Sequence, residues 1–197
     1  MAKEGQQHRL EAMSEAVRAS GEAIPPVHRW NPPDCGDIDM RIGTDGTWYY
    51  QKTPITRPAL VRLFASILKR EDDRYYLVTP VEKCGITVDD APFLAVDVAA
   101  DSTSAECVLR FLTNVGEEVV CGPDHQLRFE PQPQNGGLKP YLHVRRGLWA
   151  KVTRPVYYDL AELGEERMVG AEPWFGVVSQ GEFFPMAPAS DLKDHAE

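Results

Sequence analysis

The sequence predicts an α+β protein, built largely from antiparallel sheet with amphipathic helices, in which one hairpin–helix–strand unit occurs twice. Three observations support this fold class. Short segments carry apolar residues at every second position, as half-buried strands do. Two other segments carry apolar residues at helical spacing, with a proline in the first turn. The tripeptide Thr-Arg-Pro stands at the start of both, at residues 56–58 and 153–155.

The first predicted unit spans residues 37–98. Charged and apolar residues alternate over residues 37–42, which predicts a strand with Ile38 and Met40 buried and one charged face. Asp45-Gly46 turns this strand into a second one at residues 48–50. Pro58 then begins a helix with an apolar face. Further strands are expected near residues 75–79, 86–88 and 93–98.

The second predicted unit spans residues 141–184 and has the same order of elements. Residues 141–145 and 148–152 predict a hairpin around Arg146-Gly147. The helix that follows places four apolar or aromatic residues on one face, namely Val156, Tyr157, Leu160 and Leu163. Strands at residues 174–179 and 182–184 complete this unit, and strands expected at residues 109–114, 118–120 and 126–129 join the two units. The repeated order, rather than the shared tripeptide alone, indicates an internal duplication.

The chain is expected to divide into four parts. An N-terminal helix (residues 3–19) and its lead-in occupy residues 1–29, and the first unit with its connecting strands occupies residues 30–135. The second unit occupies residues 136–185, and residues 186–197 form a flexible tail. A Pro- and Gly-rich loop at residues 131–140 marks the predicted internal boundary.

Composition limits the classes of partner. The 197 residues carry a net charge of −9, with both halves acidic, which argues against bulk binding to nucleic acid or an anionic membrane. No apolar run is long enough to span a membrane, and the N-terminus lacks a signal peptide's apolar core. The cysteines, with no C-x-x-C pair, favour reduced thiols in a cytoplasmic protein; two disulfides in an exported protein are the alternative. They are Cys35, Cys84, Cys107 and Cys121.

The most unusual stretch is WNPPDCGDIDMRI at residues 30–42, which combines a Pro-Pro entry, a glycine and three acids. Together with later segments it resembles an uncharacterised bacterial family known as domain of unknown function 1285, over roughly residues 30–185. The later segments cover residues 43–50, 54–64, 75–83, 86–93, 113–118 and 122–125. The resemblance implies a duplicated α+β core, a second half similar to a pleckstrin-homology domain and a ligand-sensing role. No catalytic residues are established for the family, so it implies none here.

The acids of this stretch are the first candidate site. Asp37 and Asp39 point the same way from one strand, with Asp34 nearby, and paired carboxylates can bind a hard cation or act as acid and base. Arg41 lies on the same face, however. Such a row of charges is more often ion-paired or exposed to solvent than part of a metal or catalytic site.

The second candidate site is formed by Arg57 and Arg154, which stand at matching helix starts. Helix N-termini and arginine side chains both attract anions, so we expect a small anionic ligand in a cleft between the two repeats. The alternative is that each arginine pairs with an acid.

Two further residues are weaker candidates. His125 can act as a ligand or proton carrier, although a turn residue bonded to local backbone is the commoner case. Cys35 can act as a nucleophile only beside a base. The tyrosines and tryptophans are mostly expected in the core, and one or two can stack on a ring-bearing ligand.

Three functions remain open, and the sequence identifies no cofactor. The first is a non-catalytic ligand-sensing or signalling module that binds a small anion, favoured by the duplication and by the lack of a catalytic motif. The second is a metal-dependent enzyme that uses Asp34, Asp37 and Asp39. The third is a protein-interaction adaptor with an exposed apolar patch or sheet edge.

Overall fold

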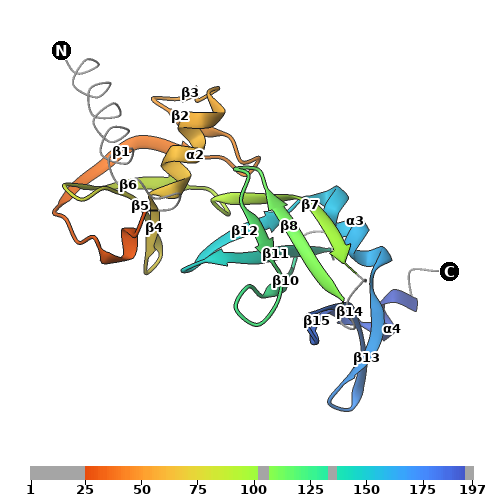
Figure 1. Ribbon diagram of the computed structural model, residues 1–197. Coiled ribbons are helices and arrows are strands. Elements are labelled where there is room, and N and C mark those ends of the chain that lie inside the picture. The colour runs from red at the N-terminus through yellow and green to blue at the C-terminus, as the bar shows by residue number, and fades with distance from the viewer. Residues whose placement is uncertain (1–24, 102–106, 133–136, 194–197) are drawn as a thin grey trace. The chain divides into compact units, whose positions relative to one another are not determined.

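The computed structural model describes residues 25–101, 107–132 and 137–193 (Figure 1). The chain divides into two compact units, Met1–Asp90 and Ala91–Glu197, which we call the N-terminal and C-terminal units. The helix predicted at residues 3–19 lies outside the described residues.

The N-terminal unit is a six-stranded sheet with strand order β3-β2-β1-β6-β5-β4. Within it, β1 and β6 run parallel and the other neighbours run antiparallel. Helix α2 (Pro58–Ser66) follows β3, and a short 3-10 helix, η1 (Val27–Arg29), precedes β1. The strands are β1 (Asp34–Ile42), β2 (Trp48–Tyr50), β3 (Thr53–Pro54), β4 (Leu68–Glu71), β5 (Arg74–Val78) and β6 (Lys83–Val88).

Local chemistry explains the β1–β2 hairpin and helix α2. The Gly43 N–H donates to the Thr47 carbonyl at 2.9 Å, and the Asp45 carboxylate accepts from the Thr47 N–H at 3.0 Å. Pro58 occupies the first turn of α2, whose residue Phe64 is fully buried and stacks on Trp48 of β2 at 6.3 Å. The predicted turn and helix start are therefore confirmed, and Phe64 is buried as expected.

The C-terminal unit contains a six-stranded sheet of order β10-β11-β12-β7-β8-β9 and a three-stranded sheet of order β13-β14-β15. Strands β12 and β7 run parallel. Helix α3 (Arg154–Glu162) joins the two sheets in the chain, and α4 (Ala189–Lys193) follows the last strand. The strands are β7 (Phe93–Asp101), β8 (Val108–Thr113), β9 (Glu118–Val120), β10 (Leu127–Pro131), β11 (Leu138–Arg145), β12 (Leu148–Val152), β13 (Glu165–Val169), β14 (Glu172–Ser179) and β15 (Glu182–Pro188).

A buried hydroxyl links the two sheets of the C-terminal unit. Ser179, at the end of β14, donates to the Cys121 carbonyl at 2.7 Å and accepts from the Leu109 N–H at 2.9 Å. In α3, Val156 and Leu160 are buried as predicted, whereas Leu163 lies just beyond the helix and is 43% exposed.

The duplication holds for the order of elements and not for the strand order. A hairpin, a helix and a three-stranded meander follow one another in both units, as β1–β2, α2 and β4–β6 and then as β11–β12, α3 and β13–β15. In the N-terminal unit the meander joins the hairpin sheet through β6, which pairs with β1. In the C-terminal unit the meander forms a separate sheet, and the hairpin pairs with β7 instead.

The boundaries also differ from those expected. The units divide between Asp90 and Ala91, whereas the strands on either side of the predicted boundary, β10 and β11, pair with each other in one sheet of the C-terminal unit. The Gln132 N–H donates to the Gly137 carbonyl at 2.7 Å. Where a flexible tail was expected from residue 186, β15 continues to Pro188 and α4 follows, because Met186 and Ala189 are buried.

Candidate anion-binding site

The conspicuous acids lie at the start of β1, which we call the signature strand (Asp34–Ile42). Asp34 accepts a hydrogen bond from the Gly36 N–H at 2.8 Å, in a turn where Gly36 has a φ of +80°. Asp37 forms an ion pair with Arg74 at 2.5 Å and lies directly over Gly85, where a Cβ atom would meet its carboxylate at 2.0 Å. Two of the three acids thus have local partners.

The rest of the signature strand confirms the predicted burial of Met40 but not that of Ile38. Met40 is buried while Asp39 and Arg41 are exposed, and Ile38 is half-buried. Arg41 pairs with Asp89 through two hydrogen bonds, one of them Nε to Oδ1 at 2.8 Å, and this carboxylate raises the pKa of the guanidinium. Asp39 has no ion-pair partner in the part of the chain that the structure describes.

The register explains why so many special residues gather there. The parallel pairing of β1 with β6 is shifted twice, between Asp34 and Asp37 and again between Asp37 and Arg41. A glycine with positive φ and an acid bonded to nearby backbone, as Gly36 and Asp34 are, are common at such irregularities. Over residues 25–101, 107–132 and 137–193, no group of three or more His, Cys, Asp or Glu side chains is placed to hold a metal ion. The Asp34/Asp37/Asp39 hypothesis therefore gains no support from geometry.

The four cysteines are all free thiols. Cys35 is exposed, and its thiol lies 3.7 Å from the Pro33 carbonyl, with no histidine bonded to it among the described residues. Cys121 is fully buried, and this burial raises its pKa to about 12, so it stays protonated at neutral pH.

His125 lies in a turn, bonded to backbone. It exchanges two backbone hydrogen bonds of 3.1 Å with Gly122, and its Nδ1 lies 3.2 Å from the His143 carbonyl. The His125 ring also stacks on the His143 ring at 6.0 Å. These contacts fit the interpretation of His125 as a turn residue bonded to local backbone.

The two predicted arginines occupy corresponding helix starts in different units. Arg57 is the exposed N-cap of α2, and Arg154 is the first residue of α3. No acid partner is found for either in the described part of the chain. Pro58 and Pro155 follow them and lack an N–H, so each helix start offers fewer backbone donors than the sequence argument assumed. Any anion site must therefore depend mainly on side chains.

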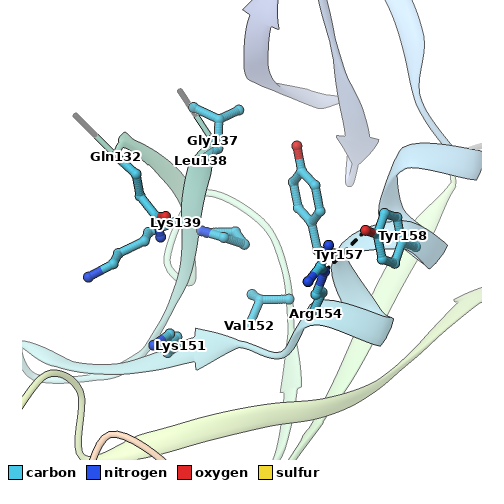
Figure 2. Close-up of a pocket in the computed structure, with 10 residues that line it drawn as sticks. Gln132, Gly137, Leu138, Lys139, Lys151, Val152, Arg154, Tyr157 and Tyr158 are labelled. Atoms are coloured by element: carbon cyan, nitrogen blue, oxygen red, sulfur yellow. Dashed lines mark hydrogen bonds between the residues drawn. The ribbon is translucent and has the colours of Figure 1, made fainter. Parts of the chain in front are cut away.

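A pocket of about 370 Å³ lies beside Arg154, within the C-terminal unit (Figure 2). Lys139, Lys151 and Arg154 contribute three cationic side chains to its lining, and none of the described residues that line it is an aspartate or glutamate. The remaining lining residues are Gln132, Gly137, Leu138, Pro140, Val152, Tyr157 and Tyr158.

The fold brings these cations together from three elements. Tyr141 of β11 pairs with Lys151 of β12, so Lys139, two residues before Tyr141, lies on the same sheet face as Lys151. The chain then passes from β12 through Thr153 into α3, which places Arg154 at the same end of the sheet. Hairpin register and helix start together produce the cationic lining.

Arg154 is held in place by a tyrosine one helical turn away. Its Nε donates to the Tyr158 hydroxyl at 3.1 Å, and its guanidinium lies 5.7 Å from the centre of that ring (Figure 2). No hydrogen bond to Nη1 or Nη2 is found among the described residues. These two groups form one edge of the guanidinium fork, the geometry that binds carboxylate or phosphate oxygens in pairs.

Sequence reasoning identified Arg154 and missed both lysines. Lys139 lies next to a loop, and Lys151 lies in an otherwise apolar strand, so neither is unusual by itself. The signal was the predicted hairpin at residues 141–152, because extending its register back by two residues places Lys139 on the sheet face of Lys151, diagonal to it.

Family models match nearly the whole described chain. The N-terminal domain of DUF1285, a domain of unknown function, matches residues 25–91, and the C-terminal domain of DUF1285, a protein of unknown function, matches residues 92–186. No curated protein matches the chain. Among the described residues, no helix is both long and apolar enough to cross a membrane.

Two solved structures are similar to this chain. A DUF1285 family protein from Silicibacter pomeroyi DSS-3 is 53% identical, with a TM-score of 0.81 over 90% of this chain and 96% of that one. A DUF1285 family protein from Shewanella baltica OS155 is 32% identical, with a TM-score of 0.51 over 64% of this chain and 91% of that one. With both family models matched in sequence order, the chain belongs to the DUF1285 family.

Proposed function

We propose that this protein is a non-catalytic ligand-binding module that senses a small anionic molecule, held in the pocket beside Arg154. The observation that carries the proposal is the lining of that pocket, with three cationic side chains and no described carboxylate. Three cationic side chains that line one hollow favour an anion there, because an anion between like charges reduces their repulsion.

The expected binding energy comes from charge-assisted hydrogen bonds. Arg154 can donate Nη1 and Nη2 to two oxygens of one anion, while Lys139 and Lys151 act as point charges on flexible stems. Each charge-assisted bond contributes about 1.5–3 kcal/mol. Three cations around one pocket suit a group with two negative charges, such as a phosphate, better than a single carboxylate.

The net charge of the chain also favours a small ligand over a large one. The chain carries a net charge of −9, so a long polyanion is repelled by the surface around a local positive site, whereas a small anion is not. A pocket of about 370 Å³ is in the size range of small-molecule sites.

Most of the other candidate residues predicted from the sequence are not part of the proposed anion site. Asp37 and Arg41 already have ion-pair partners, Asp39 carries the wrong charge for an anion, and His125 is bonded to backbone. Arg57 stays a predicted ligand residue, and it enters the experiment below as a variant. The predicted similarity of the second half to a pleckstrin-homology domain would suit a ligand-binding role, and it stays a prediction.

The test is thermal unfolding with increasing inorganic phosphate, against chloride at equal ionic strength. A ligand that binds only the folded state raises its stability by RT ln(1 + [L]/Kd), so phosphate should raise the melting temperature progressively. Arg154→Ala should weaken phosphate binding by about 1.5–3 kcal/mol, roughly ten- to a hundredfold. Lys151→Ala should act in the same direction.

Arg110→Ala is the matched control, because Arg110 is an exposed arginine on β8 of the same unit and does not line the pocket. It should keep the full response to phosphate. Arg57→Ala shows whether that arginine contributes at all. An equal response of Arg154→Ala and Arg110→Ala, or no response of the unmodified protein, would contradict the proposal.

A further inference from the structure

The edge strand β13 (Glu165–Val169) of the C-terminal unit is a second surface feature, separate from the anion pocket. In the described part of the chain it pairs with β14 alone, so its other edge has no neighbouring strand (Figure 1). All five of its residues are exposed. Met168 is 66% exposed and Val169 is 42% exposed. β13 therefore offers both an unpaired backbone edge and apolar side chains.

The other described sheet edges are protected in ways that are common in β-sheet proteins. β3 and β9 have only two and three residues. β10 ends in Pro131, which has no N–H to donate, and it lies against β15. Most residues of β4 and β15 are half-buried or buried. An exposed edge with apolar side chains, as in β13, is a template for a further strand.

The β13–β14 hairpin is held on its unit by packing and hydrogen bonds at its base. Gly164, just before β13, lies so close to the Phe175 ring that a Cβ atom there would meet the ring at 2.1 Å. At the other end of β14, Ser179 bonds to the backbone of Leu109 and Cys121. An edge that is already extended and anchored loses little conformational freedom when another strand pairs with it.

A second copy of the same chain can pair with β13 in only a few registers. In antiparallel pairing, hydrogen-bonded and non-hydrogen-bonded pairs alternate, so two identical edges meet about a two-fold axis with one residue opposite its own copy. An axis at Glu165 or Glu166 places two carboxylates opposite each other, and an axis at Arg167 places two guanidinium groups opposite each other. Like charges directly opposite are destabilising, so these three registers are unfavourable.

The register about Met168 avoids such repulsion. An axis at Val169 places Glu166 opposite Glu172 of the copy and is unfavourable for the same reason. An axis at Met168 places Met168 opposite its copy and Arg167 opposite Val169, with no like charges directly opposite. This register also covers the two exposed apolar side chains of the strand.

The charges near this axis are also compatible with pairing. Arg167 Nε donates to Glu165 at 2.5 Å, and the guanidinium lies 5.8 Å from the centre of the Phe183 ring, so its charge is compensated within its own sheet. The aliphatic stem of Arg167 can then pack on Val169 of the copy. Antiparallel pairing near the hairpin turn also points the two C-terminal units in opposite directions along the strands.

We infer that two copies of this chain associate through β13, antiparallel about an axis at Met168, so that two three-stranded sheets join into one. This goes beyond the proposed function and does not depend on the anion pocket. Few residue pairs take part, whereas stable interfaces bury roughly 1,200–2,000 Å², so the association is weak and increases with protein concentration. Salt strengthens it, because screening reduces the repulsion between two chains of net charge −9.

Cysteine cross-linking tests the register. Met168→Cys, in a chain whose exposed Cys35 is replaced by serine, should form an intermolecular disulfide on oxidation in air, because the two thiols face each other. Glu166→Cys in the same background is the matched control, since it is exposed and on the same face of β13. In this register it lies about 13 Å along the strand from its copy, so it should cross-link at least about tenfold more slowly.

Analytical ultracentrifugation measures the association without a cross-link. Between about 10 μM and about 1 mM the unmodified chain should shift from monomer towards dimer, and more so at high salt. Met168→Lys should stay monomeric, because two ammonium groups then face each other at the axis. Val81→Lys is the matched control, since Val81 is 70% exposed in the N-terminal unit and the change of charge is the same. It should associate as the unmodified chain does.

Each measurement can overturn the inference. An unmodified chain that stays monomeric at about 1 mM in about 0.5 M salt would show that a second copy does not occupy this edge. Equal cross-linking of the two cysteine variants would exclude the Met168 register. Equal loss of association in Met168→Lys and Val81→Lys would show that net charge, and not β13, governs the association. Circular dichroism reports whether each variant folds, and none of these readouts depends on phosphate binding.

Discussion

The signature strand and the pocket beside Arg154 are opposite in how they look in sequence and in structure. The signature strand has three acids, an arginine and a glycine within eight residues, and most of its charges are neutralised by neighbours, as in the Asp37–Arg74 and Arg41–Asp89 pairs. The pocket is formed by unremarkable lysines on two strands and one arginine, and no described carboxylate lines it.

The difference shows what a dense run of special residues indicates. In β1 Gly36 and Asp34 form a hydrogen-bonded turn beside a shift in strand register, and Asp37 forms an ion pair with Arg74, so these residues interact within the protein itself. A site for a ligand needs side chains of suitable charge around a hollow, and such side chains can be spread along the sequence. Charges of one sign that line a hollow are therefore better evidence of function than a crowded motif.

The largest expected effect tests whether the signature strand is mainly structural. Met40 is 1% exposed, so Met40→Ala should lower the free energy of unfolding by about 2–5 kcal/mol through lost burial and a cavity. Asp39→Ala, one residue earlier and exposed, should change it by less than about 0.5 kcal/mol. Urea denaturation measures both values.

The same two variants also separate structure from binding. Asp39→Ala should bind phosphate as the unmodified protein does. A folded Asp39→Ala variant that loses phosphate binding would break the comparison, because the signature strand would then take part in the site.

An intermediate effect concerns the support of Arg154. Tyr158→Phe removes the hydroxyl that accepts from Arg154 Nε and keeps the ring beneath the guanidinium. Phosphate affinity should fall by about 0.5–1.5 kcal/mol, as for one lost hydrogen bond, with little change in unfolding free energy. Calorimetry gives the affinity, and a fall as large as that for Arg154→Ala would mean that Tyr158 contacts the ligand directly.

The smallest effect concerns the paired charges of the N-terminal unit. Lys69 at 2.8 Å and Lys83 at 2.6 Å hold the pKa of Glu71 below its ordinary value of 4.5. Because the folded pKa is the lower one, the stabilisation is complete above the unfolded value and is lost as the pH falls through the folded value. Such a partly exposed network contributes about 1 kcal/mol or less.

Glu71→Gln isolates this contribution. Between about pH 5 and pH 3 the unmodified protein should lose more stability than the variant, as measured by urea denaturation across that range. Equal pH dependence of the two proteins would show that the Glu71 ion pairs do not contribute to stability in solution.

Much of the fold could be predicted because it depends on local rules. The Asp45-Gly46 turn, the proline-led helices and the burial of Met40 follow from turn chemistry, from the fixed φ of proline and from alternation along a strand. The pairing of β12 with β7, the separate β13–β15 sheet and the division at Asp90 depend on contacts between distant segments, which periodicity does not encode.

The site was predictable only in part for the same reason. Arg154 is visible because Thr153-Arg154-Pro155 marks a helix start. That Lys139 and Lys151 line the pocket follows only from the register of β11 with β12. That Tyr157 lines it follows only from the side of α3 that faces the pocket. Side chains from three elements form the pocket, and a linear sequence does not show their distances.

The most direct test of the anion pocket is to follow the backbone amide signals of the whole chain by nuclear magnetic resonance during a titration with inorganic phosphate. The account predicts saturable shifts at Lys139, Lys151, Arg154 and residues 156–158, while residues 34–42 of the signature strand stay unchanged. Shifts concentrated in the signature strand, or a uniform drift without saturation, would contradict the account.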